Sequence, residues 1–162
     1  MRADTLYVRD ECGEFVPAKP EVVLARAKEH LKRRMRRGTP LTSPQVVRDF
    51  LAVTLGDRDC EYFCVICLDG HHRLLRFVEL FRGTIDRASV HPREVVKLVL
   101  ECQAASVLLV HNHPSLASEV SSADELISKR LVEALSLIDV RVCDHLIVAG
   151  ATVVSMAERG LL

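Results

Sequence analysis

The sequence predicts an α/β fold in which a mixed β-sheet is flanked by helices. Apolar runs of strand length alternate with segments of helical periodicity, and Asp69-Gly70 is the strongest hairpin signal in the chain. The chain has 162 residues, of which 49% are apolar, so it can bury one sizeable core.

The first forty residues are expected to form a hairpin and a helix. Residues 1–18 alternate weakly between apolar and polar side chains, which suggests a short hairpin. Pro20 then begins a helical pattern that ends near Gly38. We expect residues 1–40 to pack on a domain formed by residues 41–162.

Three further helices are predicted in that domain. Ser43-Pro44 has the form of an N-cap followed by a proline at the first helical position, and Gly56 is a plausible end for this helix. Its pattern is expected to bury Val46, Val47, Phe50 and Leu51. The other two helices are expected at about residues 92–103 and 122–136.

The strand signals define a sheet with one fully covered strand. Residues 61–68 are apolar on both strand faces, which is typical of a central strand. The Asp69-Gly70 turn connects this strand to a partner. The remaining strands are expected at about residues 73–81, 105–110, 140–148 and 152–155.

Composition excludes several classes of protein. The 22 basic residues equal the 22 acidic ones, so no global cationic field recruits nucleic acid or anionic lipid. We see neither the apolar region of a signal peptide nor a stretch approaching the roughly 18 apolar residues of a membrane span. We therefore expect a cytoplasmic location, no membrane partner, and six cysteines present as reduced thiols or ligands.

Two histidines and an aspartate are spaced as metal ligands would be. His111 and His113 follow a buried strand run, and side chains two apart on a strand project to the same side. Asp124 lies in the first turn of the next predicted helix. Two imidazoles and one carboxylate leave a fourth tetrahedral position open, as in catalytic zinc sites. Iron and manganese also accept such ligands.

The same residues have a simpler interpretation. A histidine pair can occur by chance, and the segment from Ser121 to Glu125 is also typical of a helix cap. We expect Ser122 and Glu125 to form the capping box, which would free Asp124 from capping and let Ser121 face the loop. The two interpretations can coexist.

The motif His111-Asn112-His113-Pro114, followed by Ser121 and Asp124, resembles the JAMM motif of MPN-type metalloproteases. Further blocks resemble the RadC branch of that family, and the likeness covers about residues 41–162. These blocks are Glu61-x-Phe63-x-Val65 with Leu68-Asp69, Phe81-x-Gly83-Thr84, His91-Pro92-Arg93-Glu94-Val95, Asp144-His145-Leu146-Ile147-Val148 and Ala157-Glu158-Arg159-Gly160. The resemblance implies a JAMM/MPN architecture, which is cytidine-deaminase-like, without the N-terminal helix-hairpin-helix region that RadC proteins often carry.

The resemblance also implies roles for individual residues. His111, His113 and Asp124 would hold one Zn²⁺, Glu61 would be the general acid and base, and Ser121 would donate a hydrogen bond to the oxyanion. The implied activity is that of a zinc metallopeptidase or isopeptidase acting on a peptide or protein substrate. Leu116 stands where the family commonly has glycine, so we expect a reshaped loop with consequences for substrate fit.

Other histidine and cysteine patterns are less convincing. Cys60, Cys64 and Cys67 have the spacing of a radical-SAM iron-sulfur motif, but they interrupt an apolar strand, so we interpret them as core thiols. We expect His71 and His72 to be exposed, His91 to cap or pack, and His145 to form a structural hydrogen bond with Asp144.

A basic run offers an alternative function. Its members lie late in a predicted helix, where the helix dipole favours cations without any partner. They could also make weak contacts to nucleic-acid phosphates, as in an accessory protein of DNA repair. A non-catalytic MPN-type scaffold is the third alternative. The residues of the run are Lys32, Arg33, Arg34, Arg36 and Arg37.

Overall fold

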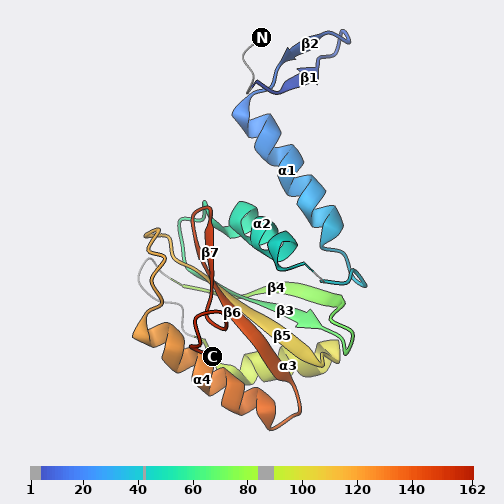
Figure 1. Ribbon diagram of the computed structural model, residues 1–162. Helices are drawn as coiled ribbons and strands as arrows, with labels where there is room; N and C mark the ends of the chain where they lie inside the picture. The colour runs from blue at the N-terminus through green and yellow to red at the C-terminus, as the bar shows by residue number, and fades with distance from the viewer. Residues whose placement is uncertain (1–4, 42, 84–89) are drawn as a thin grey trace.

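The computed structural model describes residues 5–41, 43–83 and 90–162, and it centres on a mixed five-stranded sheet (Figure 1). The strand order is β4-β3-β5-β6-β7. β3 pairs antiparallel with β4 and β5, β5 pairs parallel with β6, and β6 pairs antiparallel with β7. The predicted α/β fold is confirmed. The strands are β3 (Tyr62–Leu68), β4 (Leu74–Arg82), β5 (Ser106–Asn112), β6 (Arg141–Ala149) and β7 (Thr152–Ser155).

Helices cover both faces of this sheet. α2 (Pro44–Leu55) packs on one face, whereas α3 (Pro92–Cys102) and α4 (Ser122–Ser136) pack on the other (Figure 1). α2 and α3 begin with a proline at the first helical position, and α4 begins after its N-cap residue Ser121. Among the described residues, no helix combines the length and the apolar character that crossing a membrane requires.

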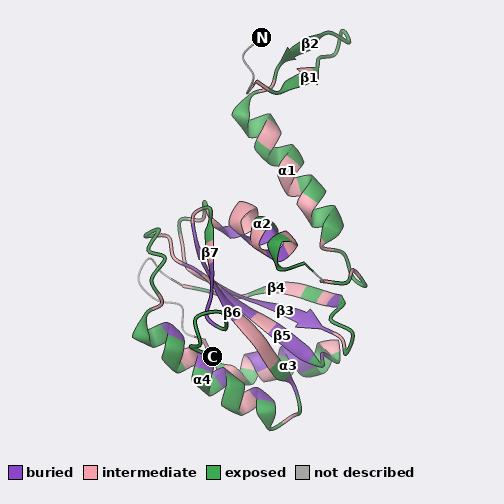
Figure 2. Cartoon of the chain, in the orientation of Figure 1, coloured by how far each residue is buried: buried purple, intermediate pink, exposed green. Residues whose placement is uncertain are grey.

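β3 is the covered strand that its apolar run predicts (Figure 2). Phe63, Val65 and Cys67 belong to the core beneath α3 and α4, whereas Cys64 and Ile66 belong to the core beneath α2. Cys64 and Cys67 therefore face opposite sides of the sheet, and burial raises the pKa of the Cys67 thiol to about 12. The interpretation as core thiols is confirmed for Cys64 and Cys67, whereas Cys60 is half-buried and precedes β3.

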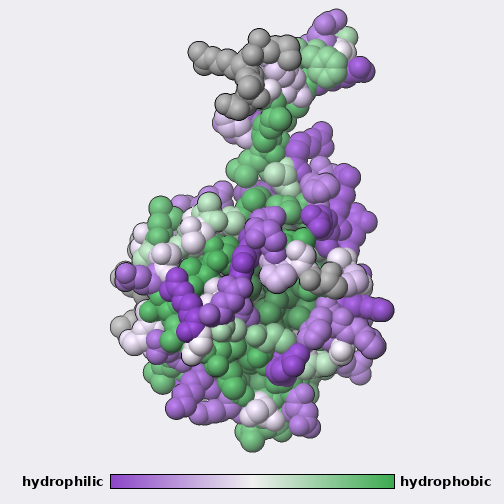
Figure 3. Space-filling model, viewed as in Figure 1, coloured by the Kyte–Doolittle hydropathy of each residue, from purple (hydrophilic) through white to green (hydrophobic). Residues whose placement is uncertain are grey.

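The N-terminal segment projects from the sheet. It consists of β1 (Tyr7–Arg9), β2 (Phe15–Pro17) and α1 (Pro20–Arg34), and the hairpin lies away from the sheet (Figure 1). We expected residues 1–40 to pack on the domain. The contacts with the α2 core come from Leu31 and Met35, at the end of α1. The rest of the segment exposes several apolar side chains, among them Leu6, Phe15, Val22 and Leu24. Figure 3 shows green, hydrophobic residues on this projecting part.

Gly56 ends α2, as predicted, although its backbone is right-handed, with φ of −66°. This position requires glycine because backbone carbonyl oxygens approach it closely. A Cβ atom added there would lie 2.2 Å from the carbonyl oxygen of Gly150 and 2.5 Å from that of Ala52. The end of α2 and the β6–β7 turn therefore meet backbone to backbone.

We expect Gly56→Ala to lower the free energy of unfolding by about 1–3 kcal/mol, because the backbone must move to admit the methyl group. Urea denaturation measures this change. Gly70→Ala is the matched control, since nothing lies within 4 Å of a Cβ at that position, and it should stay within about 0.5 kcal/mol of the wild type. A Gly56→Ala protein as stable as the control would show that the contact carries no constraint.

Candidate metal centre

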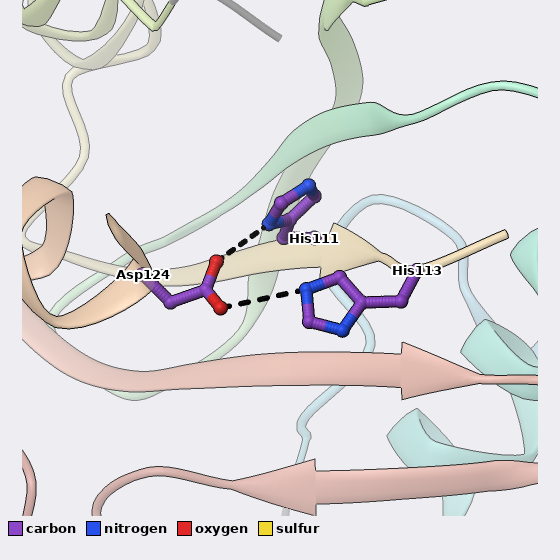
Figure 4. A group of neighbouring side chains, drawn as sticks. All are labelled: His111, His113 and Asp124. Atoms are coloured by element: carbon purple, nitrogen blue, oxygen red, sulfur yellow. Dashed lines mark hydrogen bonds and ion pairs between the residues drawn. The ribbon is translucent and has the colours of Figure 1, made fainter. Parts of the chain in front are cut away.

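The end of β5 and the start of α4 bring the three predicted ligands together (Figure 4). His111 lies in β5, His113 follows it directly, and Asp124 lies in the first turn of α4. Nδ1 of His111 is 2.9 Å from Oδ1 of Asp124, and Nε2 of His113 is 3.4 Å from Oδ2. One ligand atom from each residue lies within 4.8 Å of the others. The predicted grouping is confirmed.

Asp124 is a buried carboxylate held by several donors. Its side chain accepts hydrogen bonds from the Ser121 backbone N–H at 2.9 Å and from the Ser121 hydroxyl at 2.6 Å, in addition to His111. Burial alone would raise the pKa of Asp124, but the hydrogen bonds from His111, His113 and Ser121 outweigh it and hold that pKa well below its usual range. Asp124 therefore stays ionised and can serve as a ligand.

The expected capping arrangement is wrong in its register. Ser121, and not Ser122, is the N-cap of α4, and the capping box joins Ser121 to Asp124. Asp124 is thus both cap and candidate ligand, whereas Glu125 is not part of the box. In this geometry the Ser121 hydroxyl proton is donated to Asp124. The implied donation from Ser121 to an oxyanion stays a prediction.

His113 is oriented by its second ring nitrogen. Nδ1 lies 2.9 Å from the Ala117 carbonyl oxygen, which accepts a hydrogen bond from it. With Nδ1 held in this way, Nε2 is the ring nitrogen that faces Asp124 and that a metal ion could bind. The contact with the Asp124 carboxylate raises the pKa of His113, against the opposing effect of burial.

A metal ion fits the donor atoms of this group. His111 Nε2 is buried and, within the described part of the chain, has no hydrogen-bond partner. A buried ring nitrogen without a partner is costly unless something unseen binds it. Two imidazoles and an ionised carboxylate match the donors that zinc takes in catalytic sites. His111, His113 and Asp124 would hold the ion.

Glu61 reaches the same site from the neighbouring strand. It directly precedes β3, and its Oε2 is 3.8 Å from Nε2 of His111. Only 15% of its side-chain surface is exposed, and its carbonyl oxygen accepts a hydrogen bond from the Gly83 N–H at 2.8 Å. The carboxylate is therefore close enough to act on a group held by the histidines. Thr84, which belongs to one of the motif blocks that resemble RadC proteins, lies outside the described residues.

The loop between the ligands has a strained position. Leu116 has a φ of 62°, the left-handed conformation that favours glycine. Its N–H donates to the His113 carbonyl oxygen at 3.0 Å, which closes a turn. We expected leucine to reshape this loop, and instead leucine adopts the backbone conformation that glycine would allow.

His145 does not make the expected side-chain bond to Asp144. Asp144 accepts from the His145 backbone N–H and from the Ser155 hydroxyl, while the His145 ring lies 2.6 Å from Oγ of Ser128. His145 is fully buried, and burial lowers the pKa of its imidazole to about 3. Ser128 also donates to the Asp124 carbonyl oxygen. Ser128 therefore connects the His145 ring to the first turn of α4.

The other histidines and the basic run lie elsewhere. His71 and His72 are exposed, as expected. His91 is the N-cap residue of α3, but its side chain makes no cap hydrogen bond and its ring packs against Phe81. The basic run is exposed near the end of α1, where Arg33 pairs with Glu29 at 2.6 Å. Weak nucleic-acid contact through that run stays a prediction.

The fold and the ligand group together define a JAB-type domain, and the sequence comparison agrees. Residues 41–161 match the family of RadC-like JAB domains, so the chain belongs to the RadC family. This agrees with the resemblance carried by the motif blocks.

Among its relatives is a UPF0758 protein of Aeromonas hydrophila, 51% identical over 145 residues, which are 90% of this chain and 65% of that protein. A UPF0758 protein of Thioalkalivibrio sulfidiphilus is 52% identical over 150 residues, which are 93% of this chain and 67% of that protein. One of Shewanella amazonensis is 55% identical over 126 residues, which are 78% of this chain and 56% of that protein. The chain spans about three fifths of the length of these curated relatives.

We expect His145 to make the metal-free protein sensitive to acid. Its pKa is about 3 when folded and about 6.5 when unfolded, so between these values the unfolded state binds a proton that the folded state does not. The free energy of unfolding therefore falls as the pH falls from 6.5, by up to about 1.4 kcal/mol per pH unit from this group. Urea denaturation between pH 7 and pH 4 measures the slope.

His145→Gln should flatten that slope, because glutamine does not titrate. The matched control is His71→Gln, an exposed histidine whose replacement should leave the slope unchanged. Equal slopes in wild type and His145→Gln would exclude His145 as the source.

Proposed function

We propose that this chain is a zinc-dependent hydrolase that cleaves an amide bond, as a metallopeptidase or isopeptidase acting on a peptide or protein. The observation that carries the proposal is the mutual contact of His111, His113 and Asp124, with Glu61 beside them. Such a ligand set leaves one position of tetrahedral zinc open, which distinguishes catalytic sites from structural ones. Membership of the RadC family supports the proposal.

Zinc bound there would supply a water molecule whose pKa falls toward about 7 and a positive charge that polarises the amide carbonyl. Glu61, whose Oε2 lies 3.8 Å from Nε2 of His111, would take a proton from the attacking water and deliver it to the leaving amine. Because Glu61 is mostly shielded from solvent, its carboxylate meets few competing waters.

The protein holds its own groups ready for this chemistry. The Ala117 carbonyl oxygen orients His113, and the capping box orients Asp124 before any metal binds. Hydrogen bonds of this kind behind the ligands fix ring orientation and tautomer. His111 and Asp124 also come from the end of a strand and the start of a helix, which are rigid compared with loops, and His113 directly follows the strand.

Amide hydrolysis is the function that this geometry supports best. The nucleic-acid alternative relies on the exposed basic run. The scaffold alternative explains Asp124 as a helix cap, but it gives no role to the buried Nε2 of His111, which has no hydrogen-bond partner among the described residues.

We expect His113→Ala to lose tightly bound zinc, because two of the three protein donors cannot hold the ion alone. The measurement is metal content of the purified protein by mass spectrometry, with no metal added during preparation, and the expected change is from near one equivalent to near none. His71→Ala controls for the loss of an exposed histidine. Metal absent from the wild type, even after zinc is supplied, would contradict the proposed centre.

We expect Glu61→Gln to retain zinc and to lose turnover by about 10²- to 10⁴-fold, because glutamine cannot accept the proton. The measurement is hydrolysis of a peptide library followed by mass spectrometry, with zinc content determined on the same preparations. Glu79→Gln is the control, since this carboxylate lies in β4 and pairs with Arg58. Activity retained in Glu61→Gln would sink the assigned role.

A further inference from the structure

Asn112 lies between the two histidine ligands and is nearly fully buried, with 1% of its surface exposed. It is the only asparagine in the sequence. Its side-chain Oδ1 accepts a hydrogen bond from the Tyr62 backbone N–H at 2.7 Å, and its Nδ2 donates to the Cys60 carbonyl oxygen at 3.1 Å. These two backbone groups flank Glu61 on either side.

Where β3 and β5 diverge, a side chain has to replace the backbone hydrogen bonds between the two strands. The backbone pairing of β3 with β5 ends at Phe63 opposite His111. Beyond it, the His113 N–H donates to the Val148 carbonyl oxygen of β6, so the chain after β5 follows β6. On the other side, the Glu61 carbonyl oxygen is held by Gly83. The Asn112 amide thus continues the pairing where the backbone of β5 no longer reaches.

A side-chain amide is suited to pairing with the backbone groups of Cys60 and Tyr62. A carboxamide presents a donor and an acceptor in one plane, and both are used here on backbone groups two residues apart. A carboxylate of the same shape could accept from Tyr62, but its second oxygen would face the Cys60 carbonyl oxygen without a proton. A smaller residue would leave both backbone groups without this partner.

We propose that Asn112 is a positioning residue for Glu61. It connects the strand that carries the candidate metal ligands to the residue that carries the carboxylate, and so sets the 3.8 Å separation of Glu61 from His111. This inference rests on the proposed function in one respect, which is the role of Glu61 as general base. Asn112 itself acts through Glu61 and has no contact with substrate in this scheme.

The test compares Asn112→Asp with Glu61→Gln, the double variant and the wild type. We expect Asn112→Asp to bind one equivalent of zinc, to lower kcat by about 10- to 100-fold and to leave KM unchanged, as expected when support behind a site is lost. The double variant should be no slower than Glu61→Gln alone, because the two changes act through one carboxylate. A further loss in the double variant, or wild-type kcat in Asn112→Asp, would overturn the inference.

Cobalt(II) replaces zinc for a second measurement that needs no substrate. The visible absorption of the bound ion reports on its surroundings, and we expect Asn112→Asp to shift the bands in the same direction as Glu61→Gln. Ser155→Ala is the matched control, because it removes hydrogen bonds of a buried side chain that holds Asp144 and not Glu61. Its spectrum should equal that of the wild type.

Failure of the proposed function can be distinguished from failure of the positioning role of Asn112. If the wild type cleaves no amide faster than Glu61→Gln, the proposed function fails, and the cobalt spectra still decide the role of Asn112. A shifted Glu61→Gln spectrum beside an unshifted Asn112→Asp spectrum overturns the positioning role. If Asn112→Asp does not fold, as judged by circular dichroism, Asn112→Ser replaces it, because serine removes the amide without adding charge. The results expected of Asn112→Asp are then expected of Asn112→Ser.

Discussion

A buried, ionised carboxylate governs the arrangement of this domain around its candidate site. Asp124 is 2% exposed, and removing a charge from water to this extent is costly unless several donors compensate for it. Here the donors come from two elements, the start of α4 and the end of β5, with His113 directly beyond the strand. The contacts of Asp124 therefore fix the position of α4 on the sheet and the positions of the two histidines together.

The same region is where the sheet changes partners. β5 pairs antiparallel with β3 and parallel with β6, and the two neighbours separate at its C-terminal end. A ligand-binding site at such a separation is common in α/β sheets, because the strand ends leave room between them. In this protein Asn112 closes the gap toward β3 with side-chain hydrogen bonds, and the residues on either side of it remain turned toward Asp124.

Local rules predicted most of the fold and the grouping of the three candidate ligands, whereas the roles of Glu61 and Ser121 were implied only by the family resemblance. The strand alternation places His111 and His113 on one side, and a polar residue in the first turn of the next helix was close enough to complete the group. Consecutive serines misled the capping prediction, because Ser121 and Ser122 both have an acidic residue three positions later, and the box that forms joins Ser121 to Asp124.

The other errors and omissions involve partners that are distant in the sequence. His145 bonds to Ser128, seventeen residues away, and Asn112 bonds to backbone fifty residues away. No local pattern encodes such pairs. The one signal for Asn112 was a polar residue at the end of an apolar strand, which predicts that a buried amide must find two partners but does not say which.

The meeting of Gly56 with Gly150 has a consequence for how this sequence can vary. Gly150 stands between two constraints, since its carbonyl oxygen abuts the end of α2 and a Cβ at its own position would lie 3.3 Å from the Leu116 side chain. The β6–β7 turn thus fills the space between a helix on one face and the loop that carries His113. Although Ala151 in the same turn is exposed, an inserted residue would displace the Gly150 backbone from its contact with Gly56. Length variation in this family of domains is therefore expected at other connections, and this turn should keep its length.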